Sequence, residues 1–320
     1  MTRYDVFNGD ADGLCALQQL RLAFPTDAVL VTGTKRDIRL LDRVPAQRGD
    51  MVTVLDISVD ANRDALERAL AAGAVVEWFD HHFAGEPLAA PNFVAHLDPA
   101  PRTCTSLIVD DWLGGRSRAW ALVAAFGDNL HAEAEAIAKA EGLAPDQIRT
   151  LRDLGQCLNY NAYGDSVADL YFDPAELATR MRRHADPFAF VGEEGVLERL
   201  QMGYAEDMTS AMRTAPQVVG PGARAYFLPD GKWARRVIGA FANGLAIEYP
   251  ELAHAVFAAR SDGSFTVSVR APASRPTGAD ELTRAFPTGG GRQAAAGIDR
   301  LPPLEVDAFL RAFGARYGGA

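Results

Sequence analysis

The first hundred residues alternate short apolar runs with stretches in which apolar residues recur at helical spacing. Short apolar runs are typical of buried strands, and recurrence every three or four residues is typical of an amphipathic helix. Strands that alternate with helices form a mostly parallel sheet with helices on both faces. The predicted strands are Tyr4–Phe7, Ala28–Thr32, Met51–Ile57, Ala74–Phe79 and Phe93–Leu97, and the helices between them are Gly13–Phe24 and Asp60–Ala72.

The rest of the chain is a run of helices followed by a second region of strands. Helices are predicted at Thr105–Leu113, Ala119–Phe126, Ala132–Glu141 and Pro145–Leu158, and one long polar helix from Pro187 to about Arg213. After the Gly- and Pro-containing segment Val218–Ala223 the pattern restarts. It continues with strands near Ala225–Leu228, Ala255–Ala259 and Phe265–Arg270, a helix near Gly239–Tyr249, a Gly-rich turn at Gly289–Gly291 and an Ala-rich helix start. We therefore predict an α/β fold with a parallel-sheet metal domain (1–186), a helical linker (187–219) and a smaller α/β domain (220–320).

The composition excludes some classes of protein. The net charge of -10 argues against a protein that coats duplex nucleic acid. No apolar run is long enough to predict a membrane span, and the N-terminus has no apolar segment of a secretory signal. The cysteines Cys15, Cys104 and Cys157 have no metal-like spacing and fit thiols in a reducing cytoplasm.

Acidic and histidine residues gather where the predicted strands end. Because the carboxyl ends of parallel strands form the ligand crevice of an open sheet, these side chains are expected to converge. Asp10 and Asp12 follow the first strand, Asp56 lies at the end of the third, Asp80, His81 and His82 follow the fourth, and Asp98 follows the fifth.

Converging carboxylates raise one another's pKa, and a divalent cation removes that repulsion. Carboxylate oxygen and imidazole nitrogen suit manganese, magnesium or zinc better than a thiophilic ion. Asp56 could bridge two ions, and two ions about 3.5–4 Å apart could clamp the attacking and leaving oxygens of a phosphoryl group. Taken singly, these motifs have ordinary explanations, since Asp-X-Asp after a strand is commonly a turn or helix N-cap. Their combination, in this order, favours a metal centre.

At these residues the chain resembles a known family. GDADG at Gly9–Gly13, LDIS at Leu55–Ser58, FDHH at Phe79–His82 and FGDN at Phe126–Asn129 resemble the four motifs of the DHH phosphoesterase superfamily, which includes RecJ-like and nanoRNase-like enzymes. GGGRQAAAG at Gly289–Gly297, with VIGAFANGL at Val237–Leu245 and VSVRAP at Val267–Pro272, resembles the C-terminal domain associated with that family. The resemblance covers about residues 4 to 300.

The resemblance implies a role for each matching residue. Asp10 would hold one ion, Asp12, His81 and Asp128 the other, and Asp56 would bridge them. His82 would face the substrate phosphate, and Asp80 would orient the histidines. The chain departs from the family at three positions: Val6 replaces a metal-binding His of many small-substrate members, Asn8 an Asp of RecJ-like exonucleases, and Arg292 the usual His of the glycine motif.

Other polar residues have two interpretations each. Gly289, Gly290 and Gly291 before a predicted helix could bind an anion through backbone N–H groups, with Arg270 and Arg292 as phosphate donors. A flexible turn with solvated arginines is the alternative. Lys35 and Arg36 could line the metal cleft, although a solvated surface pair is the simpler interpretation. Asn159, Asn161 and Gly164 are expected to form a structured loop.

These observations predict a cytoplasmic, manganese-dependent phosphoesterase with two ions and an active site between two domains. Its expected substrates are short oligonucleotides or small nucleotides, with no stable complex with duplex nucleic acid and no membrane partner; the oligomeric state is left open. The alternatives are a nucleotide phosphomonoesterase or polyphosphatase, a single-strand exonuclease, and a catalytically weak nucleotide-binding module. Asp56, Asp80 and His82 are the predicted catalytic residues.

Overall fold

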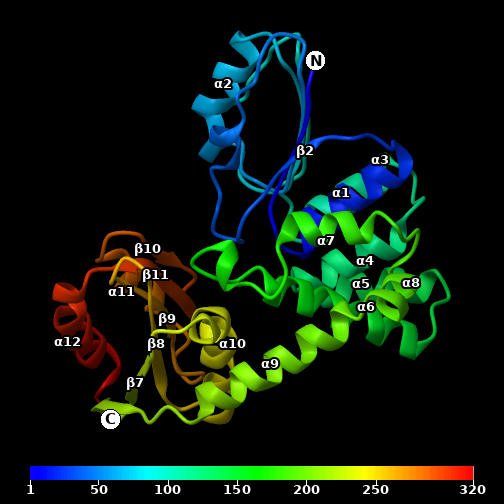
Figure 1. Ribbon diagram of the computed structural model, residues 1–320. Helices are drawn as coiled ribbons and strands as arrows, with labels where there is room; N and C mark the ends of the chain where they lie inside the picture. Colours follow the sequence, from blue (N-terminus) through cyan, green and yellow to red (C-terminus); the bar gives the residue numbers. More distant parts are fainter. Residues whose placement is uncertain (320) are drawn as a thin grey trace. The chain divides into compact units, whose positions relative to one another are not determined.

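The computed structural model describes residues 1–319. It divides into two compact units, one of Met1–Gln201 and one that begins at Met202 (Figure 1). Each unit contains its own sheet and its own hydrophobic core. No helix among the described residues is long and apolar enough to cross a bilayer.

The first unit contains a parallel sheet of five strands in the order β2-β1-β3-β4-β5. The α/β fold class predicted from the alternation of strands and helices is thus confirmed. The strands are β1 (Arg3–Phe7), β2 (Val29–Val31), β3 (Met51–Leu55), β4 (Val75–Asp80) and β5 (Phe93–Leu97). They are connected by α1 (Ala11–Ala23), α2 (Arg63–Ala71) and the short 3₁₀ helices η1 (Leu40–Arg43) and η2 (Asp60–Asn62).

Neighbouring residues of each central strand pack into different cores, because successive side chains of a strand point to opposite faces. Val54 and Trp78 pack with Leu66 of α2 on one face. Leu55 and Phe79 pack with α1 on the other face. Both faces are therefore covered, and the strands form continuous apolar runs, as expected for a buried parallel sheet. Figure 1 shows α2 and α1 on opposite sides of these strands.

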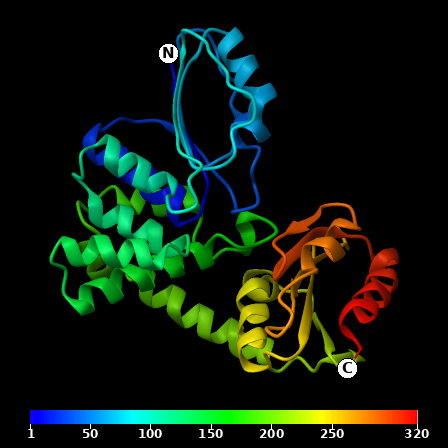
Figure 2. The same ribbon diagram turned by 180° about the vertical axis from the view of Figure 1, so that it is seen from behind.

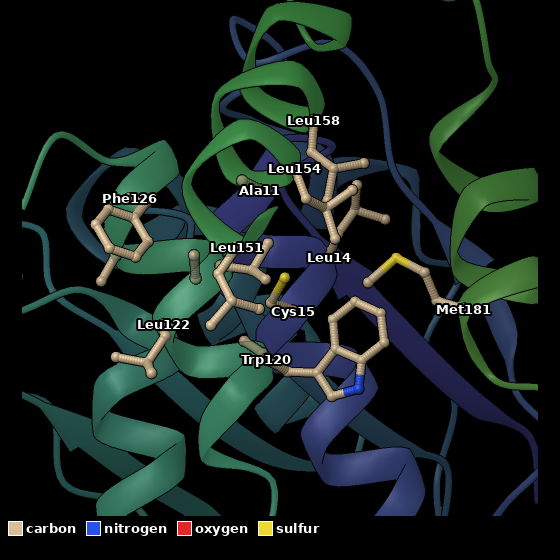
Figure 3. Packing of buried hydrophobic residues seen from close by; sticks show 14 of the residues in the cluster. Ala11, Leu14, Cys15, Trp120, Leu122, Phe126, Leu151, Leu154, Leu158 and Met181 are labelled. Atoms are coloured by element: carbon tan, nitrogen blue, oxygen red, sulfur yellow. The ribbon is translucent and has the colours of Figure 1, made fainter. Parts of the chain in front are cut away.

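Helix α1 is buried around its whole circumference over its first ten residues, Ala11–Leu20. A helix with no polar face lies in the interior of a protein. Leu14 and Cys15 contact a helical layer that contributes Trp120, Leu154 and Met181 (Figure 3). Since α1 begins directly after Asp10, this packing fixes the position of the first acidic motif.

The helical layer consists of α3 (Thr105–Trp112), α4 (Arg118–Gly127), α5 (His131–Ala140), α6 (Pro145–Asn161), the 3₁₀ helix η3 (Val167–Asp169) and α7 (Pro174–Met181). The long helix predicted from Pro187 to about Arg213 is wrong in one respect. Gly195, at a φ of 64°, separates α8 (Pro187–Glu194) from α9 (Val196–Met212). Phe190 and Leu200 of these helices lie in the core of the first unit, so much of the expected linker belongs to that unit.

The second unit contains a mixed sheet of six strands in the order β10-β11-β9-β8-β7-β6. Figure 2 shows α10 on one side of this sheet and α12 on the other. The strands are β6 (Gln217–Gly220), β7 (Ala223–Leu228), β8 (Ala253–Ala259), β9 (Phe265–Arg270), β10 (Gly289–Gly291) and β11 (Ala295–Leu301). The helices are α10 (Lys232–Glu248), α11 (Ala279–Arg284), η4 (Pro303–Glu305) and α12 (Val306–Tyr317).

The Ala-rich segment after the three glycines is a strand and not the start of a helix. Ala295–Leu301 forms β11, which pairs antiparallel with Gly289–Gly291 on one side and with β9 on the other. Alanine favours helices by local propensity, but pairing with a neighbouring strand overrides it here.

Candidate metal centre

The strand order brings the acidic motifs together. In a sheet of order 2-1-3-4-5 the chain leaves β1 and β3 in opposite directions, and ligands bind in the crevice outside their carboxyl ends. Asp10 and Asp12 follow β1, Asp56 follows β3, and Asp80 ends β4. The predicted convergence of these residues at one edge of the sheet is what the topology produces.

The loop that carries the first motif is held by close backbone packing. A Cβ atom at Gly9 would lie 2.0 Å from the carbonyl oxygen of Gly33, and one at Gly13 would lie 2.1 Å from that of Asn8. Both positions therefore require glycine. The amide of Asn8 accepts from the backbone N–H of Asp10 at 3.2 Å and donates to the Lys35 carbonyl oxygen at 3.4 Å. Asn8 thus shapes the loop with both ends of its side chain.

The two carboxylates of this loop have different partners. Asp10 is the N-cap of α1, where its Oδ1 accepts from the backbone N–H groups of Asp12 and Gly13 at 3.0 and 3.2 Å. The two oxygens of Asp12 accept from the backbone N–H groups of Thr105 and Ser106, both at 2.7 Å. Asp12 therefore also joins α1 to the N-terminus of α3, where the helix dipole stabilises negative charge.

Asp56 has a backbone conformation that is unusual for a residue with a side chain. Its φ is 58°, in the left-handed region, and such strain gathers at functional sites. Its Oδ1 accepts from the Thr105 hydroxyl at 3.1 Å. Burial, together with the charges of Asp12 and Asp10, raises the pKa of Asp56 well above its usual range. The buried carboxylate thus needs a nearby cation to stay ionised.

The two histidines after β4 have different surroundings. His82 Nδ1 lies 2.7 Å from Oδ1 of the fully buried Asp80, and this hydrogen bond raises the pKa of His82 despite partial burial. Its exposed ring keeps Nε2 for another partner. His81 is mostly buried, and its Nε2 lies 3.4 Å from Asp56 Oδ1, 3.8 Å from Asp128 Oδ2 and 3.9 Å from Asp12 Oδ2.

Asp128 reaches the centre from the helical layer. It is the C-cap of α4, and Asn129 at a φ of 63° ends the helix. At Gly127 a Cβ atom would lie 2.5 Å from that of Ala11 and 2.8 Å from the carbonyl oxygen of Gly155. The glycine of this motif therefore lets α4 approach α1 and α6, which brings Asp128 to the sheet edge.

The donor set fits a divalent ion. Two groups of ligand atoms lie within 4.8 Å of one another, one from Asp12, His81 and Asp128 and one from Asp56, His81 and His82. Both groups offer oxygen and nitrogen, which suits manganese or magnesium. Most of these side chains also line a pocket of about 220 Å³, formed by Asn8, Asp10, Lys35, Ile38, Asp56, Ile57, Ser58, His81, His82 and Asp128.

Lys35 belongs to this pocket, so the expectation of a solvated surface residue was wrong. Its ammonium group forms a salt bridge with Asp10 Oδ2, donates to Asn159 Oδ1 at 3.0 Å and lies 3.7 Å from Asp128 Oδ1. Burial acts to lower the pKa of Lys35, but the charge of Asp10 outweighs it and raises that pKa well above normal. The sequence offered a place in the cleft only as the lesser alternative for Lys35. Asn159 was expected in a loop but lies in α6, and Thr105 was not singled out.

The anion site predicted at Gly289–Gly291 depended on a helix beginning directly after the three glycines, and the structure has no helix there. These residues form an edge strand, so no helix N-terminus follows them. Arg292 lies exposed in the turn to β11, and Arg270 donates to Asn243 Oδ1 at 2.8 Å and to Ser268 Oγ at 3.0 Å. Ala295 of β11 pairs with Arg270 of β9. Arg270 therefore lies at the end of the sheet where the turn between β10 and β11 carries Arg292.

Asp98 does not join the centre. It is exposed, and its Oδ1 accepts from the backbone N–H of Ala100 at 3.0 Å. Ser58 donates from its hydroxyl to the Phe83 carbonyl oxygen at 2.9 Å, which ties the loop after β3 to the loop after the two histidines.

Solved structures share this fold over almost the whole chain. The exonuclease RecJ bound to manganese is 19% identical, with a TM-score of 0.63 over 98% of this chain and 90% of that one. A pGpG-specific phosphodiesterase from Vibrio cholerae is 16% identical, with a TM-score of 0.53 over 100% of both chains. An exopolyphosphatase-related protein from Bacteroides fragilis is 11% identical, with a TM-score of 0.51 over 98% of this chain and 90% of that one.

No protein-family model and no curated protein matches the chain. The similarity is therefore one of architecture, carried by both units. The chain shares the fold of these solved structures, which include the exonuclease RecJ.

Proposed function

We propose that the protein is a divalent-metal-dependent phosphoesterase that hydrolyses phosphodiester bonds in short oligonucleotides or small nucleotides. The observation that carries this proposal is the convergence of Asp12, Asp56 and Asp128 on His81 Nε2, each within 4 Å of it, at the carboxyl edge of the parallel sheet. The three carboxylates surround one imidazole nitrogen, and Asp56, His81 and Asp128 line a pocket.

The similar structures support a nucleotide substrate. Two of them are named as an exonuclease and as a pGpG-specific phosphodiesterase, and the exonuclease is bound to manganese. We therefore propose manganese as the preferred ion and linear dinucleotides as the first substrates to test. A continuing basic groove or stacking platform would be needed to hold a long strand, and the net charge of -10 does not favour one.

The proposed chemistry assigns a task to each side chain. A divalent ion bound by Asp12, Asp56, His81 and Asp128 would polarise a phosphoryl oxygen and make water a better nucleophile. His82, oriented by Asp80 through the 2.7 Å contact, would present Nε2 to the leaving oxygen and donate a proton to it. Asp56 is the residue on which this arrangement depends most, since it lies beside both histidines.

In the second unit we propose that Arg270 and Arg292 bind a phosphate of the substrate other than the reacting one, with help from backbone N–H groups of Gly289, Gly290 and Gly291. Guanidinium groups bind phosphate oxygens through paired hydrogen bonds.

The three cysteines are free and two of them are buried, which supports the cytoplasmic location predicted from the sequence.

A nucleotide-binding module with weak catalysis is the second candidate function. The observation that favours it is the salt bridge between Lys35 and Asp10, because it occupies a carboxylate that a metal ion would otherwise use. Such a module would bind nucleotides with metal present and release them unchanged.

A hydrolysis screen separates these candidates. The protein, freed of metal and then supplied with Mn²⁺, is offered pGpG, short RNA and DNA, nucleoside monophosphates and polyphosphate, and products are resolved by chromatography. We expect cleavage of phosphodiester bonds in dinucleotides and trinucleotides. Release of inorganic phosphate from monoesters or polyphosphate alone would replace the proposed substrate class, and tight binding without any product would establish the binding module.

A further inference from the structure

Lys35 is held in place through both its backbone and its side chain. Its backbone N–H donates to the Ala162 carbonyl oxygen at 2.9 Å, and its own carbonyl oxygen accepts from the Asn8 amide. Its ammonium group donates to Asn159 Oδ1 at 3.0 Å and forms the salt bridge with Asp10 Oδ2. Only 27% of the side chain is exposed, so this is a fixed cation of the pocket and not a mobile surface lysine.

This arrangement neutralises Asp10 with a cation of the chain itself, whereas the two oxygens of Asp12 accept from uncharged backbone N–H groups. Asp10 Oδ1 accepts from two backbone N–H groups of α1, and its Oδ2 is engaged by Lys35. The nearby polar side chain of Asn8 has both ends in use within the loop, and Val6 lies wholly in the core. On this side of the pocket the carboxylate of Asp10 already has a cation beside it, whereas on the other side His81 lies near three carboxylates.

From this geometry we propose that the ammonium group of Lys35 takes the place of the second metal ion, so that the centre holds one divalent ion, bound through Asp12, Asp56, His81 and Asp128. This proposal replaces the two-ion centre expected from the sequence. It rests on the proposed function for its chemical meaning, but ion binding can be measured without any hydrolysis.

The position of Asp128 supports a centre with one ion and one ammonium group. Its Oδ1 lies 3.7 Å from Lys35 Nζ, and its Oδ2 lies 3.8 Å from Nε2 of His81, a proposed ligand of the ion. A second divalent ion beside the ammonium would be repelled by it at short range, and in a partly buried pocket that repulsion is only weakly screened. A lysine supplies a permanent single positive charge with three donors, suited to a phosphate oxygen as well as to Asp10.

The test is the number of Mn²⁺ ions bound per chain. The full-length protein is stripped with chelator and titrated with Mn²⁺ by calorimetry, and the bound ion is examined by electron paramagnetic resonance. We expect one tightly bound ion with the signal of an isolated Mn²⁺. Lys35→Ala frees Asp10 and opens the space, so it should bind a second ion and show the signal of a coupled pair. Lys35→Arg keeps the charge and should bind one.

Arg39→Ala is the matched control, because Arg39 is an exposed cation of the same segment that pairs with Asp42; it should bind one ion. Two coupled ions in the unchanged protein would overturn the proposal, and so would a single ion in both the unchanged protein and Lys35→Ala. If Lys35→Ala does not fold, Lys35→Met replaces it with the same expectation of a second ion. One ion without any hydrolysis would uphold this proposal and reject the proposed function, whereas no bound ion would overturn both.

Discussion

His81 Nε2 lies 3.4 Å from Asp56 Oδ1, although the two residues follow different strands of the parallel sheet. This contact joins the ends of β3 and β4, and Asp12 and Asp128 come within 4 Å of the same nitrogen from α1 and the end of α4. The centre is therefore assembled from four separate parts of the chain, each fixed by its own packing.

Substrate length should affect the rate. The pocket beside the histidines is small, about 220 Å³, and the protein carries a net charge of -10. Each further phosphate of a longer strand would meet a surface of the same sign, at a cost that salt screens. We expect kcat/KM to fall for oligomers beyond about five nucleotides, and the fall to be smaller at higher ionic strength. Processive digestion of a long strand at the rate of a dinucleotide would support an exonuclease instead.

Arg292→Ala should raise KM and leave Mn²⁺ binding unchanged. Arg292 is exposed in the turn before β11, and loss of a charged hydrogen bond to phosphate should weaken binding by about ten- to a hundredfold. Arg300→Ala, which removes an exposed cation of β11 that pairs with Asp262, is the control. Equal kinetics for both variants and the unchanged protein would show that Arg292 is only a surface residue. Arg292→His tests whether the commoner residue of the family motif can replace it.

The buried ion pair between Arg236 of α10 and Asp207 of α9 should contribute strongly to stability. Its two contacts measure 2.7 and 3.0 Å, and both side chains are almost fully buried. Asp207→Ala leaves a buried guanidinium without its carboxylate and should lower the free energy of unfolding by about 3 kcal/mol or more. The pair of the exposed Asp230 with the partly buried Arg235 is the control, and Asp230→Ala should cost less than about 1 kcal/mol because Asp230 itself is solvated. Urea unfolding that gives equal losses for the two variants would contradict this ranking.

His254 should make the protein less stable in mild acid. It is fully buried in β8, its Nε2 lies 3.1 Å from the Tyr249 carbonyl oxygen, and burial lowers its pKa below the usual 6.5. The unfolded chain therefore takes up a proton at this histidine before the folded protein does, so stability is present above pH 6.5 and is lost as pH falls toward the lower folded pKa. His254→Gln should reduce that loss in thermal unfolding between pH 7 and pH 5. An unchanged pH dependence would assign it to other groups.

The parts of the fold that could be predicted are those in which burial alone decides the pattern. The central strands β1, β3 and β4 contribute residues to the cores on both faces of the sheet, so their positions followed from their apolar runs. The segment Ala295–Leu301 was predicted wrongly because its alanines favour a helix locally, while its pairing with β9 depends on residues distant in the chain.

In the candidate site, too, the sequence predicted what depends on local residues and not what depends on contacts between distant ones. Asp12, Asp56 and His81 could be named because acidic and histidine residues at strand ends are unusual in combination, whereas Asp128, at the end of a helix, was named only through the resemblance of its motif to a family. For Lys35 the sequence favoured the wrong alternative, because a lysine after a strand looks like any solvated lysine until the fold brings Asp10, Asp128 and Asn159 around it. Local sequence thus indicates the ligands, and only the tertiary structure shows which of them are already neutralised.

The most direct measurement is hydrolysis of a linear dinucleotide by the metal-free protein, before and after addition of Mn²⁺, compared with Asp56→Asn. Asparagine tolerates the left-handed φ of 58° at this position, so the variant should keep the fold and its melting temperature. We predict no turnover in chelator, recovery with Mn²⁺, and a loss of at least about a hundredfold in kcat for Asp56→Asn. Asp98→Asn, at an exposed acid after β5, should keep full activity. Turnover that survives complete metal removal, or full activity in Asp56→Asn, would contradict the assignment of this cluster as a catalytic metal centre.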